Sequence, residues 1–65
     1  MDFGSALTAL KSGAQVYRIG WGGSTCITLN ENAICAGSKA ELPINFTRVW
    51  YPSCADMLAS DWELL

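Results

Sequence analysis

The shortness of the chain limits its fold more than any single motif does, because 65 residues can enclose only one small hydrophobic core. We therefore expect a single domain over residues 1–65. Such a domain buries only about 60% of the surface that its unfolded chain exposes, so its stability as a monomer is marginal. Yet 51% of the residues are hydrophobic and 15% are charged, more apolar than a lone small domain easily hides. This excess predicts a homo-oligomer that buries apolar surface between subunits.

The N-terminal segment predicts an amphipathic helix. Apolar residues recur at three- and four-residue steps between Phe3 and Leu10, which places them on one helix face. Asp2 is the expected N-cap, because its carboxylate can accept hydrogen bonds from the free N–H groups of the first turn. Gly13 is expected to end the helix in a left-handed conformation, and Lys11 places a cation where it suits the helix dipole.

The rest of the chain predicts short strands and one further helical turn. Segments rich in β-branched and aromatic residues predict strands at residues 15–19, 25–29, 33–36, 44–51 and 62–65. Glycines around Trp21 predict a tight turn, residues 30–32 a second turn and residues 37–41 a loop. Residues 55–59 predict a short helix with Ser53 as its N-cap. We therefore expect an α+β fold, in which an N-terminal helix packs on a small antiparallel β-sheet and a short helical turn lies near the C-terminus.

The charges exclude long nucleic acids as partners. Four scattered basic residues face six acidic ones, whereas a long nucleic acid needs a clustered basic face. Three of the basic residues show no pattern and are expected to be solvated, namely Lys11, Lys39 and Arg48. A small phosphorylated ligand is still compatible, because one or two arginines and backbone N–H groups can hold it. With no run of about 20 apolar residues and no secretory signal pattern, we expect a cytoplasmic protein without a membrane partner.

Catalytic and metal-binding groups are scarce. The chain has no histidine, which excludes Ser-His and Cys-His relays. Cys26, Cys35 and Cys54 include no close pair of the kind that a structural zinc site has, so we expect buried, reduced thiols. Asp56 and Asp61 are the nearest carboxylate pair, but their place at the end of a short helix favours a cap and a solvated side chain. We expect no enzyme, no catalytic residue, no metal and no cofactor.

The tryptophans are the first candidates for ligand binding. Trp21 lies in the glycine-rich turn and Trp50 ends a strand, positions from which flat rings can stack on a nucleobase. The alternative for both is closure of the core or of a subunit interface, where tryptophan is also enriched. Trp62, in the terminal apolar strand, is expected to belong to the core or to an interface.

Three polar residues complete the candidate site. Arg18 leads into the Trp21 turn, from which it can reach a phosphate in bidentate fashion, and a surface ion pair is the alternative. Ser53 begins a helix N-terminus, which is a ready anion site. Asp56 lies at the same helix start, either to bind a ribose hydroxyl or to cap the helix.

Two runs of residues occur in a distinctive combination. The first is Phe3-x-x-Ala6-Leu7-x-x-Leu10-Lys11-x-Gly13-x-x-Val16-x-Arg18-x-Gly20-Trp21-x-Gly23. The second is Val49-Trp50-Tyr51-Pro52-Ser53-x-Ala55-Asp56-Met57-Leu58-Ala59-x-Asp61-Trp62. They resemble, in the same order, the N- and C-terminal signatures of the Thoeris anti-defense family, second type. The second run is the more specific of the two.

The resemblance implies ligand binding without catalysis. Members of that family bind cyclic ADP-ribose isomers made by Toll/interleukin-receptor-type defence enzymes and hold them intact, and some bind cyclic oligonucleotides at separate sites. They form homotetramers with pockets between subunits. The implied function is a phage anti-defence protein, in the cytoplasm of an infected bacterium, that sequesters a cyclic nucleotide second messenger as a homo-oligomer, with a tetramer favoured over a dimer. The alternative is a structural or partner-binding oligomeric module that keeps the fold without the ligand.

The resemblance also assigns roles to the candidate residues. Trp21 and Trp50 match the tryptophans expected to stack on the base of the ligand. Arg18 matches the basic position of the first signature. Ser53 and Asp56 match the junction between loop and helix in the second.

The chain departs from the family pattern at two places. Gly22 stands where the family usually has asparagine, which removes one polar contact to the ligand. Only residues 43–48 stand where members usually carry a longer hairpin before the Trp-x-Pro-Ser step. We therefore expect an altered pocket shape, above all at the site for cyclic oligonucleotides.

Overall fold

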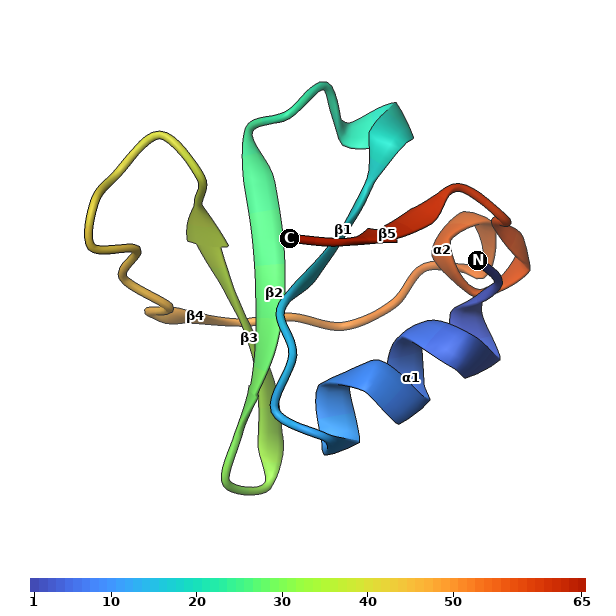
Figure 1. Cartoon of the computed structure of the whole chain (residues 1–65), viewed down its shortest axis with the longest axis horizontal. Coiled ribbons are helices and arrows are strands. Elements are labelled where there is room, and N and C mark those ends of the chain that lie inside the picture. The colour runs from blue at the N-terminus through green and yellow to red at the C-terminus, as the bar shows by residue number, and fades with distance from the viewer.

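A five-stranded antiparallel sheet and two short helices make up the computed structural model of the chain, which describes residues 1–65 (Figure 1). The elements in chain order are α1 (Phe3–Lys11), β1 (Val16–Arg18), the 3-10 turn η1 (Ile19–Trp21), β2 (Thr25–Asn30), β3 (Ala33–Ser38), β4 (Arg48–Val49), α2 (Cys54–Leu58) and β5 (Trp62–Leu64). The strand order across the sheet is β4-β3-β2-β1-β5. The predicted α+β fold is confirmed.

Local sequence signals set both ends of α1. At the N-terminus, the Asp2 side chain accepts a hydrogen bond from the Ser5 N–H group over 2.8 Å. At the C-terminus, Gly13 takes a positive φ of 96°, a conformation that glycine adopts at little cost. Ala6 and Leu10 are the buried residues of the helix. The helix predicted from the sequence is therefore confirmed.

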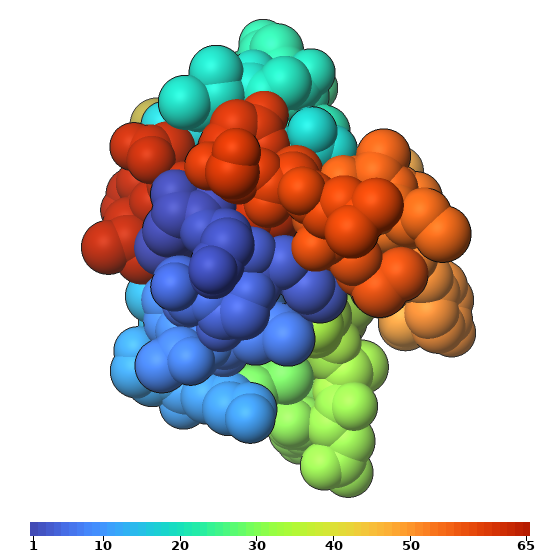
Figure 2. All heavy atoms as spheres, turned by 90° about the vertical axis from the view of Figure 1, so that its right-hand side faces the viewer, coloured from blue at the N-terminus to red at the C-terminus, as the bar shows by residue number.

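One hydrophobic core lies between α1 and one face of the sheet. Ile27 pairs with Val16 on one side and Ala36 on the other, so these three side chains form a row across that face. The buried cluster consists of Ala6, Leu10, Val16, Ile27, Ala36 and Trp62. Figure 2 shows α1 lying directly against the segment that contains α2 and the start of β5, which closes the core from the C-terminal side. Trp62 is fully buried, which confirms its predicted place in the core.

The connection from β3 to β4 packs against β3 on the face of the sheet opposite the core. It passes so close to Gly37 that a Cβ atom there would lie 2.7 Å from the Asn45 carbonyl oxygen. Gly37 and Ser38 belong to β3, so the predicted loop over residues 37–41 starts too early. The strand is longer than its composition suggested because each of its six residues pairs with β2.

The prediction of one long strand over residues 44–51 is wrong. Only Arg48 and Val49 pair with β3, opposite Ala36 and Cys35. The residues before them have high β-propensity, but they cross over Gly37 outside the plane of the sheet. A strand needs a partner backbone within reach, and here the path of the connection decides which residues have one.

Two further positions differ from the sequence prediction. Ile19 leaves the predicted strand and begins η1, where its N–H group donates to the Asp61 carbonyl oxygen over 3.1 Å. Cys54 is exposed rather than buried, because it lies in the first turn of α2, whose buried residue is Asp56. The predictions for the other cysteines are confirmed, because both are buried free thiols.

We expect Gly37→Ala to destabilise the domain by about 1–3 kcal/mol, the usual cost of overpacking a closely fitted site. The added methyl group would meet the Asn45 carbonyl oxygen at 2.7 Å and the Ile44 side chain at 2.8 Å. Urea unfolding followed by circular dichroism measures the loss. Gly4→Ala is the matched control, because the nearest atom lies at 3.6 Å and alanine favours a helix by about 0.5–1 kcal/mol. Equal stabilities of the two variants would contradict the close approach at Gly37.

Candidate ligand-binding site

A pocket opens at the end of the core that is nearest to β4. Its volume is about 370 Å³, within the range of small-molecule sites. The lining residues are Trp21, Thr25, Ala36, Arg48, Val49 and Trp50. Sequence analysis named both tryptophans as ligand-binding candidates, and the structure places them in one pocket although 29 positions separate them in the chain.

Two different elements bring the tryptophans together. Trp21 ends η1, where Gly22 caps the turn with a φ of 73°, a conformation that favours glycine. Trp50 follows β4 and extends its pairing, since its N–H group donates to the Ile34 carbonyl oxygen over 2.7 Å. The two ring centroids lie 5.9 Å apart with an interplanar angle of 66°. This edge-to-face geometry leaves the rings inclined to one another rather than stacked.

Trp62 is the buried partner of both pocket tryptophans. Its ring centroid lies 5.2 Å from that of Trp21 and 6.0 Å from that of Trp50, nearly perpendicular in both cases. The two outer rings are half-buried, because one side of each packs on the core cluster. They therefore close the core and line the pocket at the same time.

The floor of the pocket comes from one face of the sheet. Ala36 pairs with Arg48 across β3 and β4, and Thr25 lies two residues from Ile27, the β2 partner of Ala36. These positions share a face because side chains alternate along strands. Arg48 is exposed, as expected, but its place in the pocket was not predicted from the sequence. The available signal was its place two residues before Trp50 in an extended segment.

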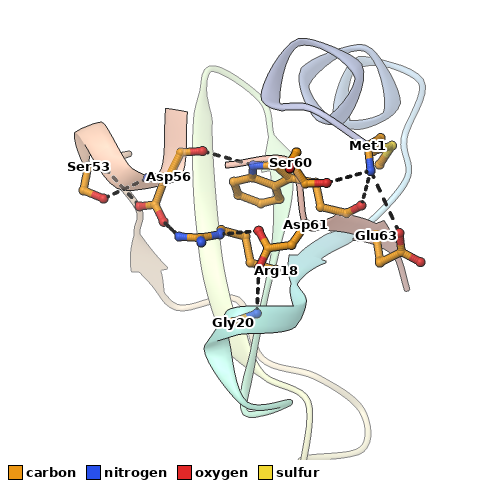
Figure 3. A network of polar contacts seen from close by, with 9 residues as sticks. Met1, Arg18, Gly20, Ser53, Asp56, Ser60, Asp61 and Glu63 are labelled. Atoms are coloured by element: carbon orange, nitrogen blue, oxygen red, sulfur yellow. Dashed lines mark hydrogen bonds and ion pairs between the residues drawn. The ribbon is translucent and has the colours of Figure 1, made fainter. Parts of the chain in front are cut away.

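Arg18 does not line the pocket, and its guanidinium lies in an ion-pair network with two aspartates (Figure 3). Its Nε atom donates to Asp61 over 2.8 Å and its Nη1 atom donates to Asp56 over 2.9 Å. The second carboxylate oxygen of Asp61 accepts the Gly20 N–H group at 2.8 Å. The ion pair left open as the alternative for Arg18 is thus present, and through Gly20 it holds the turn that carries Trp21.

Asp56 and Ser53 form the N-terminal cap of α2. The Ser53 side chain accepts the Asp56 N–H group at 3.1 Å, and the Asp56 carboxylate accepts the Ser53 N–H group at 2.9 Å. The indole N–H group of Trp62 donates to the Asp56 carbonyl oxygen over 3.1 Å. The predicted cap at Ser53 is therefore confirmed. Neither residue lines the pocket, so their ligand-binding roles, like that of Arg18, stay predictions.

A sequence profile of the Thoeris anti-defense 2-like domain matches residues 1–65. The chain belongs to the Thoeris anti-defense 2-like family. It is similar to Thoeris anti-defense 2 of Bacillus phage SP01, with 32% identity over 84 aligned positions that take in the whole chain and 94% of the relative. Since this chain has 65 residues, at least 19 of those positions, the difference between the two lengths, belong to the relative alone. The family resemblance found in the sequence is confirmed.

Family membership assigns the chain to anti-defence proteins directed against Thoeris. The family name describes an inhibitor of a defence system and not an enzyme class. In this member, no helix is long and apolar enough to cross a membrane. No group of three or more histidine, cysteine, aspartate or glutamate side chains is close enough to hold a metal ion.

The ionisation of the network follows from its hydrogen bonds. Burial alone would raise the pKa of Asp56, but the Ser53 and Arg18 donors outweigh burial and hold that pKa below its usual range. The Arg18 donor and then the Gly20 N–H group lower the pKa of Asp61. The same carboxylates raise the pKa of Arg18. All three side chains of this Thoeris anti-defense 2-like chain are therefore charged at neutral pH.

Proposed function

We propose that this chain acts against Thoeris by binding a cyclic nucleotide signal, a cyclic ADP-ribose isomer in the first place, in the pocket of Trp21 and Trp50. The observation that carries the proposal is the meeting of these two rings at one opening. Half-buried rings with fixed orientations can stack on a base at little entropic cost. Family membership in an anti-Thoeris group supports the same target.

We further propose sequestration without cleavage. The side chains that line the pocket are aromatic, aliphatic, hydroxyl or guanidinium groups. A hydrolase needs a group that accepts a proton near neutral pH, and neither a carboxylate nor an imidazole lies among them. Two further carboxylates, those of Asp56 and Asp61, are held by Arg18 and by backbone N–H groups. A ligand bound in the pocket would therefore not be cleaved and would be released chemically intact.

The exposed apolar surface supports a homo-oligomer, with a tetramer favoured and a dimer as the alternative. The exposed large hydrophobic residues are Ile19, Leu29, Leu42, Val49, Tyr51, Met57, Leu58, Leu64 and Leu65. Leu42, Leu58 and Tyr51 are at least 80% exposed, and contacts between subunits would remove such side chains from water. Because the pocket opens beside Val49, a second subunit at β4 would cover the bound ligand.

Native mass spectrometry with cyclic ADP-ribose isomers and cyclic di- and trinucleotides tests the proposal. We expect a discrete oligomer that carries intact ligand, and a melting temperature that rises with ligand concentration. Heating the complex and analysing the released compound separates sequestration from turnover. An oligomer that binds none of the compounds would favour a partner-binding module, and converted ligand would favour an enzyme.

We expect Trp21→Ala and Trp50→Ala each to weaken cyclic ADP-ribose binding by about 1–3 kcal/mol, the measured range for loss of a ring stacked on a base. Isothermal titration calorimetry gives the dissociation constant, and native mass spectrometry verifies the assembly of each variant. Tyr17→Ala is the matched control, because this half-buried ring lies outside the pocket and is not among the exposed apolar residues. Wild-type affinity in a correctly assembled Trp21 or Trp50 variant would remove the stacking role of that ring.

A further inference from the structure

We propose that Arg48, and not Arg18, is the residue that contacts the phosphate groups of the bound nucleotide. This inference rests on the proposed function and names the contact that recognises the charged part of the ligand. Arg48 lines the pocket together with both tryptophans. Its guanidinium makes no ion pair and no side-chain hydrogen bond within the chain, so its donors are free.

The donors of Arg18 are already engaged. Its Nε and Nη1 atoms donate to Asp61 and Asp56, and its side chain is only 19% exposed. Turning this guanidinium toward the pocket would leave two carboxylates without their cation, one of them the buried Asp56. An uncompensated buried charge is strongly unfavourable. Arg18 therefore holds the fold around the site.

The two lysines are no better placed to meet a phosphate in the pocket. The Nζ atom of Lys39 lies 3.5 Å from the centre of the Tyr17 ring, a cation–π contact. Tyr17 points to the sheet face opposite the pocket floor, because it is next to Val16 in β1, whose side chain is in the core. Lys11 is in the last turn of α1 and does not line the pocket. Among the four cations of the chain, only Arg48 is both unpaired and at the pocket.

The chemistry of Arg48 matches the ligand class. A guanidinium offers planar, bidentate hydrogen bonds to two phosphate oxygens, which an ammonium group cannot reproduce. Arg48 and Trp50 lie two residues apart in an extended segment and line the same pocket, so the guanidinium is placed beside a nucleotide stacked on Trp50. Arg48 is exposed on the pocket rim, where it remains solvated until the ligand arrives.

The test compares Arg48→Gln and Arg48→Lys with wild type, using cyclic ADP-ribose isomers as probes at low and high salt. We expect Arg48→Gln to raise the dissociation constant by about 10- to 100-fold, as for loss of a charged hydrogen-bonded contact. Arg48→Lys should recover part of that loss, since it keeps the charge without the bidentate geometry. The affinity of Arg48→Gln should also respond less to salt than that of wild type. Lys11→Gln is the matched control for net charge and should bind as wild type.

The outcomes separate this inference from the proposed function. If wild type binds the probes and Arg48→Gln binds them with the same affinity and salt response, the role of Arg48 is overturned and the function stands. If wild type binds none of the probes, the proposed function fails and this inference fails with it. If Arg48→Gln does not assemble, the affinity of Arg48→Lys and the salt response of wild type test the role of Arg48 instead. A wild-type affinity that does not change with salt would overturn the phosphate contact.

Discussion

Trp62→Ala should unfold most of the population, because the expected loss of about 3–5 kcal/mol is comparable to the whole stability of so small a domain. The indole is fully buried, and its ring contacts Phe3, Trp21 and Trp50 at centroid distances between 5.2 and 6.0 Å. Removing it opens a cavity where α1, η1 and the end of β4 meet, and collapse around alanine cannot fill that space. Urea unfolding at fixed protein concentration, followed by circular dichroism, measures the change.

Trp62→Phe is the matched control for the ring. It keeps an apolar ring in the core but deletes the hydrogen bond from the indole N–H group to the Asp56 carbonyl oxygen. We expect it to cost about 1–3 kcal/mol, from the smaller ring and the unsatisfied carbonyl group. A Trp62→Ala variant within about 1 kcal/mol of wild type would contradict the central place of this residue.

The same residue connects the core to the candidate site. Trp21 and Trp50 belong to separate elements, and each meets Trp62 edge to face. Their orientation in the pocket therefore depends on a fully buried side chain that does not line the pocket. A variant at Trp62 that still folds is expected to lose ligand affinity as well as stability.

Features that depend on neighbours in the sequence could be predicted. The caps of α1 and α2 both act across three residues, from Asp2 to Ser5 and between Ser53 and Asp56, so the spacing alone identifies them. The strand at residues 25–29 could also be predicted, since its β-branched residues lie within β2. In each case, the residues that determine the local structure are only a few positions apart in the sequence.

Features that depend on the path of the chain could not be predicted. The segment at residues 44–51 has a strand composition, yet its first half crosses the sheet over Gly37. Arg18 and Asp61 are 43 positions apart, and no local pattern indicates that β1 and β5 lie side by side. Arg48 gained its place at the pocket from its pairing with Ala36, 12 positions earlier in the chain.

Asp56→Asn should destabilise the domain by about 2–3 kcal/mol, because two donors need an acceptor where an amide offers a single oxygen. The carboxylate accepts the Arg18 guanidinium with one oxygen and the Ser53 N–H group with the other, in a residue only 9% exposed. In the variant, one donor must face the amide NH₂ group instead. Thermal unfolding measures the loss, and Glu41→Gln, at an exposed position without an ion pair, is the control that should match wild type.

The pH dependence of the free energy of unfolding tests how much the negative charge of Asp56 contributes to stability. Because the folded pKa values of Asp56 and Asp61 are lowered, both carboxylates stabilise the fold fully above the unfolded value of about 3.9. Their contribution disappears as the pH falls through the lower folded values. The free energy of unfolding of wild type should thus stay level from neutral pH to about pH 5 and fall below about pH 4. Asp56→Asn should lose less over that range, so that the two curves converge in acid. Parallel curves would mean that the negative charge of Asp56 adds nothing to stability, either through Arg18 or through the Ser53 N–H group.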